Sequence, residues 1–360
     1  MITLLNIRYL ALQVLIFLSG CVLEKNQRMA GKQLMRAVRV AQFGGPEVLK
    51  VETNVPVPVP TQSQVLVEVK AAGINPVDTY IRSGTYAIKP PLPFTPGSDV
   101  AGIVKDVGAN VTKFKPGERV YVSRKVYVSG GYAEFSTADE TDIGHLAENA
   151  TFQQGAGIGI PCFTAFKALC FLGREKVKPG NSVLIHGASG AVGLACVQIA
   201  VSRGLKVYGT AGTQEGIDLV LKQGATAVFN HREEGYADKI VEATGGVGPD
   251  LIVEMLANVN LETDLKIINR RGLIVVVGNR GSIEINPRLA MQKESLVTGM
   301  ILMNATPEEW AEMHAEISEG LKAGWLAPHI CKEYKLEEAP VAHDEVINNQ
   351  GTLGKRVFVL

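Results

Sequence analysis

The feature that most constrains the fold is the alternation of strand-like and helix-like segments after about residue 150. The strand-like segments are SVLIHG, KVYGTAG, AVFNH, LIVEML and LIVVVG. Apolar strands separated by helix-length stretches predict parallel strands that crossover helices bury on both faces. We therefore expect an α/β, doubly wound Rossmann sheet in this half of the chain, with SLVTGMIL (295–302) as a candidate sixth strand.

The preceding residues, from 35 to about 150, have a different pattern. Short alternating segments such as VLVEVKAAGI are separated by turns rich in Gly and Pro, which is typical of β structure. The final GKRVFVL is strand-like but leaves no room for another crossover, so we expect it to rejoin the first domain. The predicted division is a mostly β domain over 31–155, completed by about 305–360, and a dinucleotide-binding domain over 156–304.

The first 30 residues stand apart from both domains. Residues 1–21 contain one Arg, an apolar run and the sequence LSGC, a pattern that is typical of a secretory or lipid-attachment signal. The apolar run is too short for a stable membrane span of about 20 residues. An upstream extension with Met29 as an alternative start is the other interpretation.

The composition bears on which binding partners the protein can have and on the cellular compartment in which it folds. Lys+Arg and Asp+Glu are equal at 36 each, so no net charge attracts nucleic acid or an anionic membrane. The five Cys are odd in number and form no C-x-x-C pair. This usage favours a reducing compartment, so we expect the protein in the cytoplasm unless residues 1–21 act as a signal.

The sequence HGASGAVG places Gly187, Gly190 and Gly193 directly after the SVLI segment and at the start of an apolar helix-like run. A helix N-terminus leaves backbone N–H groups without partners and attracts anions, and glycine lets a phosphate approach. The spacing is G-x-x-G-x-x-G rather than G-x-G-x-x-G, so a plain strand-to-helix turn is the alternative. The position after the first strand of a βαβ series favours a dinucleotide cradle.

The end of the second strand bears on the cofactor. NAD-binding folds often carry an acidic residue there for the ribose hydroxyls, whereas VYGTAG carries none. A 2′-phosphate would not be repelled, so NADP(H) is favoured over NAD(H). His231, Arg232 and Lys206 are candidates for its positive partner, although Glu215 also follows the turn.

The sequence also lacks several catalytic patterns. No His is paired with Cys or with a second His at ligand spacing, so no metal is expected. No G-x-S-x-G motif supplies a nucleophile. Asp78 and Glu254 are isolated acids in the sequence and are interpreted as structural or cofactor-orienting groups. The difficult chemical step is therefore assigned to a cofactor, by hydride delivery.

From about residue 35 onward the chain resembles the medium-chain dehydrogenases/reductases, and within them the zinc-free, zeta-crystallin type of quinone oxidoreductase. The resemblance rests on FGGPEVLK, NPVDTYIRSGTY, PGSDVAG, HGASGAVGLA, GTAGTQEG, VFNHRE, EMLANVNL and EINPR, among others. It implies a Rossmann domain and a GroES-like catalytic domain. Zinc-dependent relatives carry Cys and His where this chain has Asn75 and Ser98, so the resemblance also implies no catalytic zinc.

The resemblance further implies a set of NADPH contacts, by motif. Tyr80 reaches the cofactor from the first domain, and the glycine turn holds the pyrophosphate. Backbone contacts are expected from the strand at 300–302. The implied cofactor residues are Tyr80, Ser189, Gly190, Ala191, Val192, Gly212, His231, Asn260, Val277, Gly278, Asn279, Arg280, Met300, Ile301 and Leu302. Tyr80 alternatively packs in the core, and His231 and Arg280 are alternatively surface groups.

Asn75 and Tyr86 are the candidates for the substrate pocket, although Asn75 alternatively shapes the turn before Pro76 and Tyr86 alternatively packs. The implied activity is reduction of ortho- or para-quinones by NADPH, with single-electron transfer to a semiquinone reported for such enzymes. Reduction of α,β-unsaturated carbonyls is the enzymatic alternative, and it would depend more strongly on Tyr80 or Tyr86 as a proton donor.

The resemblance also implies partners. Family members form dimers and tetramers, so a homo-oligomer is expected, and an apolar edge at SLVTGMIL suits such pairing. An alternative of another class is a bulk lens-type protein or a protein that binds AU-rich RNA. The balanced charge argues against tight non-specific RNA binding, so RNA is kept only as a weak partner.

Overall fold

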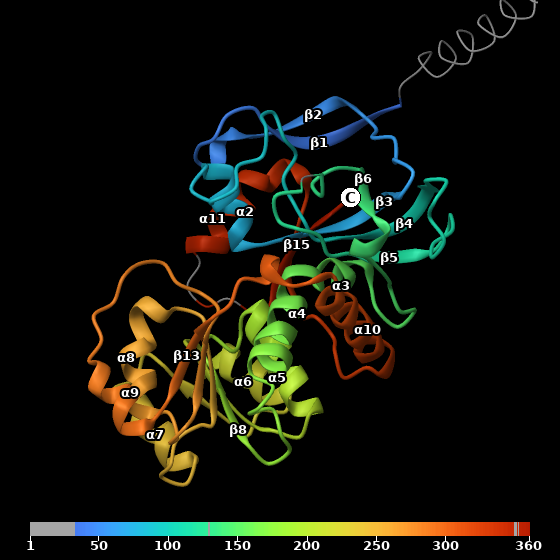
Figure 1. Cartoon of the computed structure of the whole chain (residues 1–360). Coiled ribbons are helices and arrows are strands. Elements are labelled where there is room, and N and C mark those ends of the chain that lie inside the picture. The colour runs from blue at the N-terminus through green and yellow to red at the C-terminus, as the bar shows by residue number, and fades with distance from the viewer. Residues whose placement is uncertain (1–32, 129, 349–350, 352) are drawn as a thin grey trace, which may run out of the picture.

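The computed structural model describes residues 33–128, 130–348, 351 and 353–360. The signal-like segment predicted over residues 1–30 lies outside these residues. The described chain forms two lobes, each built around its own sheet (Figure 1). The first lobe contains the N-terminal residues and the C-terminal strand, and the second contains the middle of the sequence.

The sheet of the second lobe has six parallel strands in the order β10-β9-β8-β11-β12-β13. The strands are β8 (Ser182–Ile185), β9 (Lys206–Ala211), β10 (Ala227–Asn230), β11 (Leu251–Glu254), β12 (Leu273–Val276) and β13 (Leu296–Gly299). In chain order this is 3-2-1-4-5-6, the doubly wound Rossmann arrangement. The predicted α/β class is confirmed, and the direction of winding reverses between β8 and β11.

Helices join these parallel strands. They are α5 (Ala191–Ser202), α6 (Gln214–Lys222), α7 (Tyr236–Ala243), α8 (Ala257–Ile267) and α9 (Pro287–Lys293). All residues of β8 and β11 are buried, which explains why these strands read as unbroken apolar runs. Helix α5 is apolar around most of its circumference, which agrees with its packing against both the sheet and α4 (Gly159–Phe166).

The sheet of the first lobe has seven strands. Its main path runs β14-β15-β3-β4-β5-β7, and β6 also pairs with β3. The strands are β3 (Gln64–Ile74), β4 (Val100–Val107), β5 (Arg119–Val122), β6 (Phe135–Asp139), β7 (Ile143–His145), β14 (Ile330–Tyr334) and β15 (Lys355–Val359). A separate antiparallel pair, β1 (Leu34–Val40) and β2 (Leu49–Pro56), lies beside this sheet.

The remaining helices frame this sheet. They are α2 (Pro76–Ser83), α3 (Phe152–Ala156), α10 (Pro307–Ala323) and α11 (Ala339–Asn348). Strand β15 pairs antiparallel with β3, so the C-terminal segment completes the sheet that the N-terminal half begins. One apolar cluster includes Tyr121 of β5, Phe163 of α4 and Val183 of β8, so the two lobes share part of their core.

In the part of the chain that the structure describes, no helix combines the length and the apolar character needed to cross a bilayer.

The contact between β8 and α5 depends on Gly193. An ideal Cβ at this position would press against the carbonyl oxygen of Gly187 and lie 2.7 Å from Ala188 Cα, and both are backbone atoms that cannot turn aside. We expect Gly193→Ala to lower the free energy of unfolding by about 1–3 kcal/mol, as overpacking does. Denaturant unfolding followed by circular dichroism measures this change.

Gly190→Ala is the matched control for this prediction, because its Cβ would lie 3.4 Å from its nearest neighbour, the Gly187 oxygen. Its stability is expected to stay within about 1 kcal/mol of the wild-type value. Equal losses in the two variants would contradict the steric argument.

Candidate functional site

A cavity of about 480 Å³ lies where the two lobes meet. The loop between β8 and α5 forms one wall, and the start of β15 together with the turn before α2 forms another. The volume is within the range of small-molecule and cofactor sites, and the position is the switch point of the parallel sheet, where such sites occur.

Gly187, Gly193 and Arg232, to which the sequence patterns pointed, line this cavity, whereas Lys206 does not. Eight of the cofactor and substrate residues that the family resemblance implies line it as well. They come from the turn before α2, the glycine loop and the loops that follow β9, β10 and β12. They are Asn75, Ser189, Gly190, Ala191, Val192, Gly212, His231 and Arg280. These residues are far apart in the sequence, and the parallel sheet brings them together.

The other predicted residues do not belong to the cavity lining. They are Tyr80, Tyr86, Asn260, Val277, Gly278, Asn279, Met300, Ile301 and Leu302. Gly278 lies directly behind the wall, because its backbone packs on Met255, which does line the cavity. Tyr86 packs at the edge of the first lobe's core, and burial raises the pKa of its hydroxyl.

Two backbone groups of the segment 300–302, which is predicted to contact the cofactor, form hydrogen bonds within the chain itself. The amide N–H of Met300 donates to the carbonyl of Val276 at 2.9 Å, and the carbonyl of Ile301 accepts from Lys167 Nζ at 3.1 Å. The side-chain amide of Asn260 donates to Glu254 at 3.1 Å. These three contacts hold the loops around the cavity in place.

The charge of the cavity is one-sided. Its basic lining residues are His231, Arg232, Arg280, Lys355 and Arg356, and no Asp or Glu is present among the described residues that line it. The N-terminus of α5 opens into the same space, and its N-cap, Gly190, has no side chain to cap the free N–H groups. Such a cavity suits a ligand with several negative charges.

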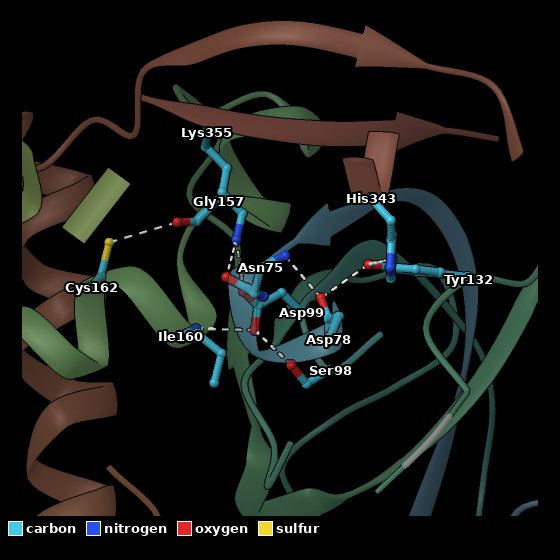
Figure 2. Close-up of polar contacts among 10 residues, drawn as sticks. All are labelled: Asn75, Asp78, Ser98, Asp99, Tyr132, Gly157, Ile160, Cys162, His343 and Lys355. Carbon is cyan, nitrogen blue, oxygen red and sulfur yellow. Dashed lines mark hydrogen bonds and ion pairs between the residues drawn. The ribbon is translucent and has the colours of Figure 1, made fainter. Parts of the chain in front are cut away.

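The first-lobe wall contains a buried ion pair that no sequence pattern indicated. Lys355 Nζ donates to Asn75 Oδ1 and, at 3.2 Å, to Asp99 Oδ2 (Figure 2). Asn75 Nδ2 donates to the same Asp99 oxygen at 2.8 Å. Asp99 is fully buried and Lys355 is only 3% exposed, so each charge depends on the other for compensation.

A second set of contacts fixes the backbone of Asn75. Its N–H donates to Asp78 Oδ2 at 2.8 Å, and the Tyr132 hydroxyl donates to the same oxygen at 2.9 Å (Figure 2). Burial raises the pKa of Asp78 to about 7. Burial also lowers the pKa of His343, which contacts Tyr132, to about 3. Asn75 is therefore held through both its backbone and its side chain.

Asp78 and Glu254 are isolated in the sequence, but neither is isolated in the structure. Asp78 belongs to the network around Asn75. Glu254 lies in a fully buried group with His186 and Asp264, whose ligand atoms are all within 4.8 Å of one another. Across the described ranges this is the one group of three or more His, Cys, Asp or Glu with such spacing. The sequence did not reveal it, because its members come from β8's end, β11 and α8.

Comparisons with known proteins define the class. Residues 61–161 match the family model described as alcohol dehydrogenase GroES-like domain, and residues 191–319 match the model described as zinc-binding dehydrogenase. The two models lie on the two lobes in the order found in medium-chain dehydrogenases/reductases, and the chain is a member of that superfamily.

Curated relatives narrow the assignment. The chain is 52% identical to a human quinone oxidoreductase over 330 residues, 92% of this chain and 99% of that protein. It is 34% identical to Escherichia coli quinone oxidoreductase 1, over 88% and 97% of the two chains. A crystal structure of Escherichia coli quinone oxidoreductase complexed with NADPH has a TM-score of 0.79 at 32% identity, covering 91% of this chain and 99% of that one. The chain belongs to the quinone oxidoreductase family.

The Asp99–Lys355 pair leads to a stability prediction. Lys355→Met leaves Asp99 buried without its cation, and we expect a loss of about 3–5 kcal/mol in the free energy of unfolding. The double variant Lys355→Met with Asp99→Asn removes both charges and is expected to recover most of that loss. Denaturant titrations of both variants test this, and a double variant no more stable than Lys355→Met would refute the ion-pair account.

Proposed function

We propose that this chain is an NADPH-dependent, zinc-independent quinone oxidoreductase. The observation that carries the proposal is the cavity in which the glycine loop at the α5 N-terminus is joined by Arg232, Arg280 and Arg356 and by no carboxylate. A dinucleotide with a pyrophosphate and a 2′-phosphate has the matching charge. The family membership and the NADPH complex of the Escherichia coli relative support the same cofactor.

The proposed placement follows the lining residues. The loop Ser189–Val192 binds the pyrophosphate, and Gly212 with His231 borders the adenosine ribose. An ideal Cβ at Gly212 would lie 3.0 Å from both Arg232 Nε and His231 Nε2. A side chain at this position would therefore fill the space beside these two basic side chains. We place the 2′-phosphate in this space. Tyr80, Asn260, Val277–Arg280 and Met300–Leu302 stay predicted contacts.

We propose that a flat quinone occupies the part of the cavity beside Asn75, with Tyr86 as a second, more distant candidate. Ile74, Ile160 and Pro161 supply apolar surface on that side. NADPH supplies the reducing electrons, and an electron-poor quinone needs little acid catalysis. The Lys355 ammonium donates to Asn75, one of the two positions at which zinc-dependent relatives carry a ligand, so a cation already lies beside that position. This arrangement supports a reaction without zinc.

The proposal extends to the domain boundaries, the oligomeric state and the location of the protein. The catalytic domain comprises 31–155 with about 305–360, and the cofactor domain 156–304. Strand β13 is at an edge of its sheet and carries the exposed residues Leu296 and Val297, which supports a homo-oligomer, dimer or tetramer. The described cysteines are all free thiols, which supports a cytoplasmic location.

The activity is tested by NADPH oxidation with 9,10-phenanthrenequinone and, in parallel, with a 2-alkenal. We expect the quinone to be reduced faster, and Tyr86→Phe to change its rate by less than about threefold. An essential proton donor would instead cost about 100-fold or more. Alkenal turnover well above quinone turnover, lost in Tyr86→Phe, would assign the chain to the alkene reductases instead.

Cofactor preference is tested at Arg232. Arg232→Gln removes a charged donor to the 2′-phosphate, and we expect the Kd of NADPH to rise by about 10- to 100-fold while that of NADH changes little. Fluorescence titration of both cofactors measures the split. Arg270→Gln, an exposed arginine paired with Glu294, is the control and is expected to alter neither Kd. An equal rise in the Kd of NADH would show that Arg232 does not act through the 2′-phosphate.

A further inference from the structure

The group His186, Glu254 and Asp264 lies directly behind the loops that form the cofactor cavity. His186 precedes Gly187 of the glycine loop, and Glu254 precedes Met255 and Leu256. Gly187, Met255 and Leu256 line the cavity. The three side chains are buried, with Glu254 and Asp264 at 0% exposure. His186 Nε2 lies 2.9 Å from Asp264 Oδ1 and 3.5 Å from Glu254 Oε2.

The charges in this group do not balance without an additional cation. In the described residues no Lys or Arg forms an ion pair with Glu254 or Asp264, and His186 is the sole basic partner of both. Glu254 Oε2 and Asp264 Oδ2 have no hydrogen-bond donor, although both are buried. Two buried carboxylates beside one imidazole are costly unless one carboxyl keeps its proton.

The hydrogen bonds of His186 leave that proton unassigned. Its Nδ1 lies 3.3 Å from Thr210 Oγ1, which itself accepts from the Gly187 N–H at 3.1 Å. The hydroxyl proton of Thr210 is therefore free to point at Nδ1, and Nε2–H donates to Asp264. A neutral His186 is fully satisfied in this way, and Glu254 Oε2 and Asp264 Oδ2 still lack a donor.

We infer that Glu254 and Asp264 share one proton, and that this protonated pair positions the loops that bind the dinucleotide. This inference rests on the proposed function. Glu254 Oε1 accepts from the backbone N–H of Leu256, and the Glu254 carbonyl accepts from Val277 at 2.8 Å. The group therefore contacts the loops that follow β8, β11 and β12. These three residues act as positioning residues, because none of them lines the cavity.

Loss of the proton adds one negative charge behind a site that binds phosphates, so affinity for NADPH falls as pH rises. Burial raises the pKa of Glu254 to about 7, which puts the transition near neutral pH. Burial alone would lower the pKa of His186, but Asp264 and Glu254 together raise it. The cluster is therefore protonated and least negative on the acid side.

Other titratable groups face this cluster. Tyr236 from α7 has its pKa raised, chiefly by burial, and stays neutral over the range of interest. His231, after β10, has its pKa lowered by burial and by Arg232, so it loses its charge at lower pH than the shared proton does. The 2′-phosphate itself titrates near pH 6. Because His231 and the 2′-phosphate are the same in wild type and in the variants, a difference between their pH profiles with NADPH reports the titration of the cluster alone.

The experiment is a fluorescence titration of NADPH from about pH 6.5 to about pH 8.5 with wild type and Glu254→Gln. The amide of the variant can still accept from Leu256 and can donate to Asp264 permanently, so it imitates the protonated state. We expect the wild-type Kd to rise by about 10-fold over this range and the Glu254→Gln Kd to stay within about twofold. Glu262→Gln, an exposed acid on α8 paired with Lys266, is expected to keep the wild-type profile.

Infrared difference spectroscopy of the protein without cofactor gives a readout that is independent of activity. A protonated carboxyl band that disappears as pH rises, and that is absent in Glu254→Gln, supports the shared proton. Asp264→Asn is the second variant, should Glu254→Gln fail to fold, and it is expected to remove the same band and the same pH dependence.

Three results would overturn the inference. They are an identical pH profile in wild type and Glu254→Gln, no carboxyl band that titrates, and a stoichiometric divalent metal in the purified protein that is lost in Glu254→Gln. The proposed function fails separately, by lack of quinone reduction. NADPH binding with the expected pH profile but without quinone turnover would keep the shared proton and reject the quinone assignment.

Discussion

The parallel register of the six-stranded sheet is the constraint on which the rest of the structure depends. Parallel strands have their carboxyl ends at one edge, so the segments that follow β8, β9, β11 and β12 meet there. These segments begin near Gly187, Gly212, Met255 and Val277. Because the central strands β8 and β11 are fully buried, they are fixed by apolar packing, and the loops that follow them are free to carry polar chemistry.

The second constraint is the return of the C-terminal strand. The Gly354 N–H donates to the Ser189 carbonyl at 2.7 Å, and Gly190 and Gly354 form an isolated parallel bridge. This contact ties β15 of one lobe to the glycine loop of the other. The next two residues, Lys355 and Arg356, enter the cavity from it. The cavity therefore depends on both lobes, and its basic character is contributed by both.

The features that could be predicted from the sequence are those encoded by short local patterns. Apolar strand runs, the Gly187–Gly193 spacing and the acid-free end of β9 are each properties of a few adjacent residues, and the α/β class followed from them. Lys355 gave no such signal, because its partners Asn75 and Asp99 lie in the other half of the chain and a lone lysine near a C-terminus is ordinarily exposed. The surroundings of Glu254 gave no signal for the same reason. Its partners His186 and Asp264 become neighbours only when the strand order places β11 beside β8.

The two buried acidic groups on either side of the cavity are neutralised in different ways. Asp99 is balanced by the Lys355 ammonium, which lies 3.2 Å from its Oδ2. Glu254 and Asp264 have no such cation and depend on His186 and a proton. The wall that carries Asn75 therefore has a lysine as the partner of its buried Asp99, whereas the group behind the cofactor loops depends on a proton. Loss of the proton from this group should consequently act first on the affinity for the dinucleotide, because the group contacts the cofactor loops and none of its members lines the cavity.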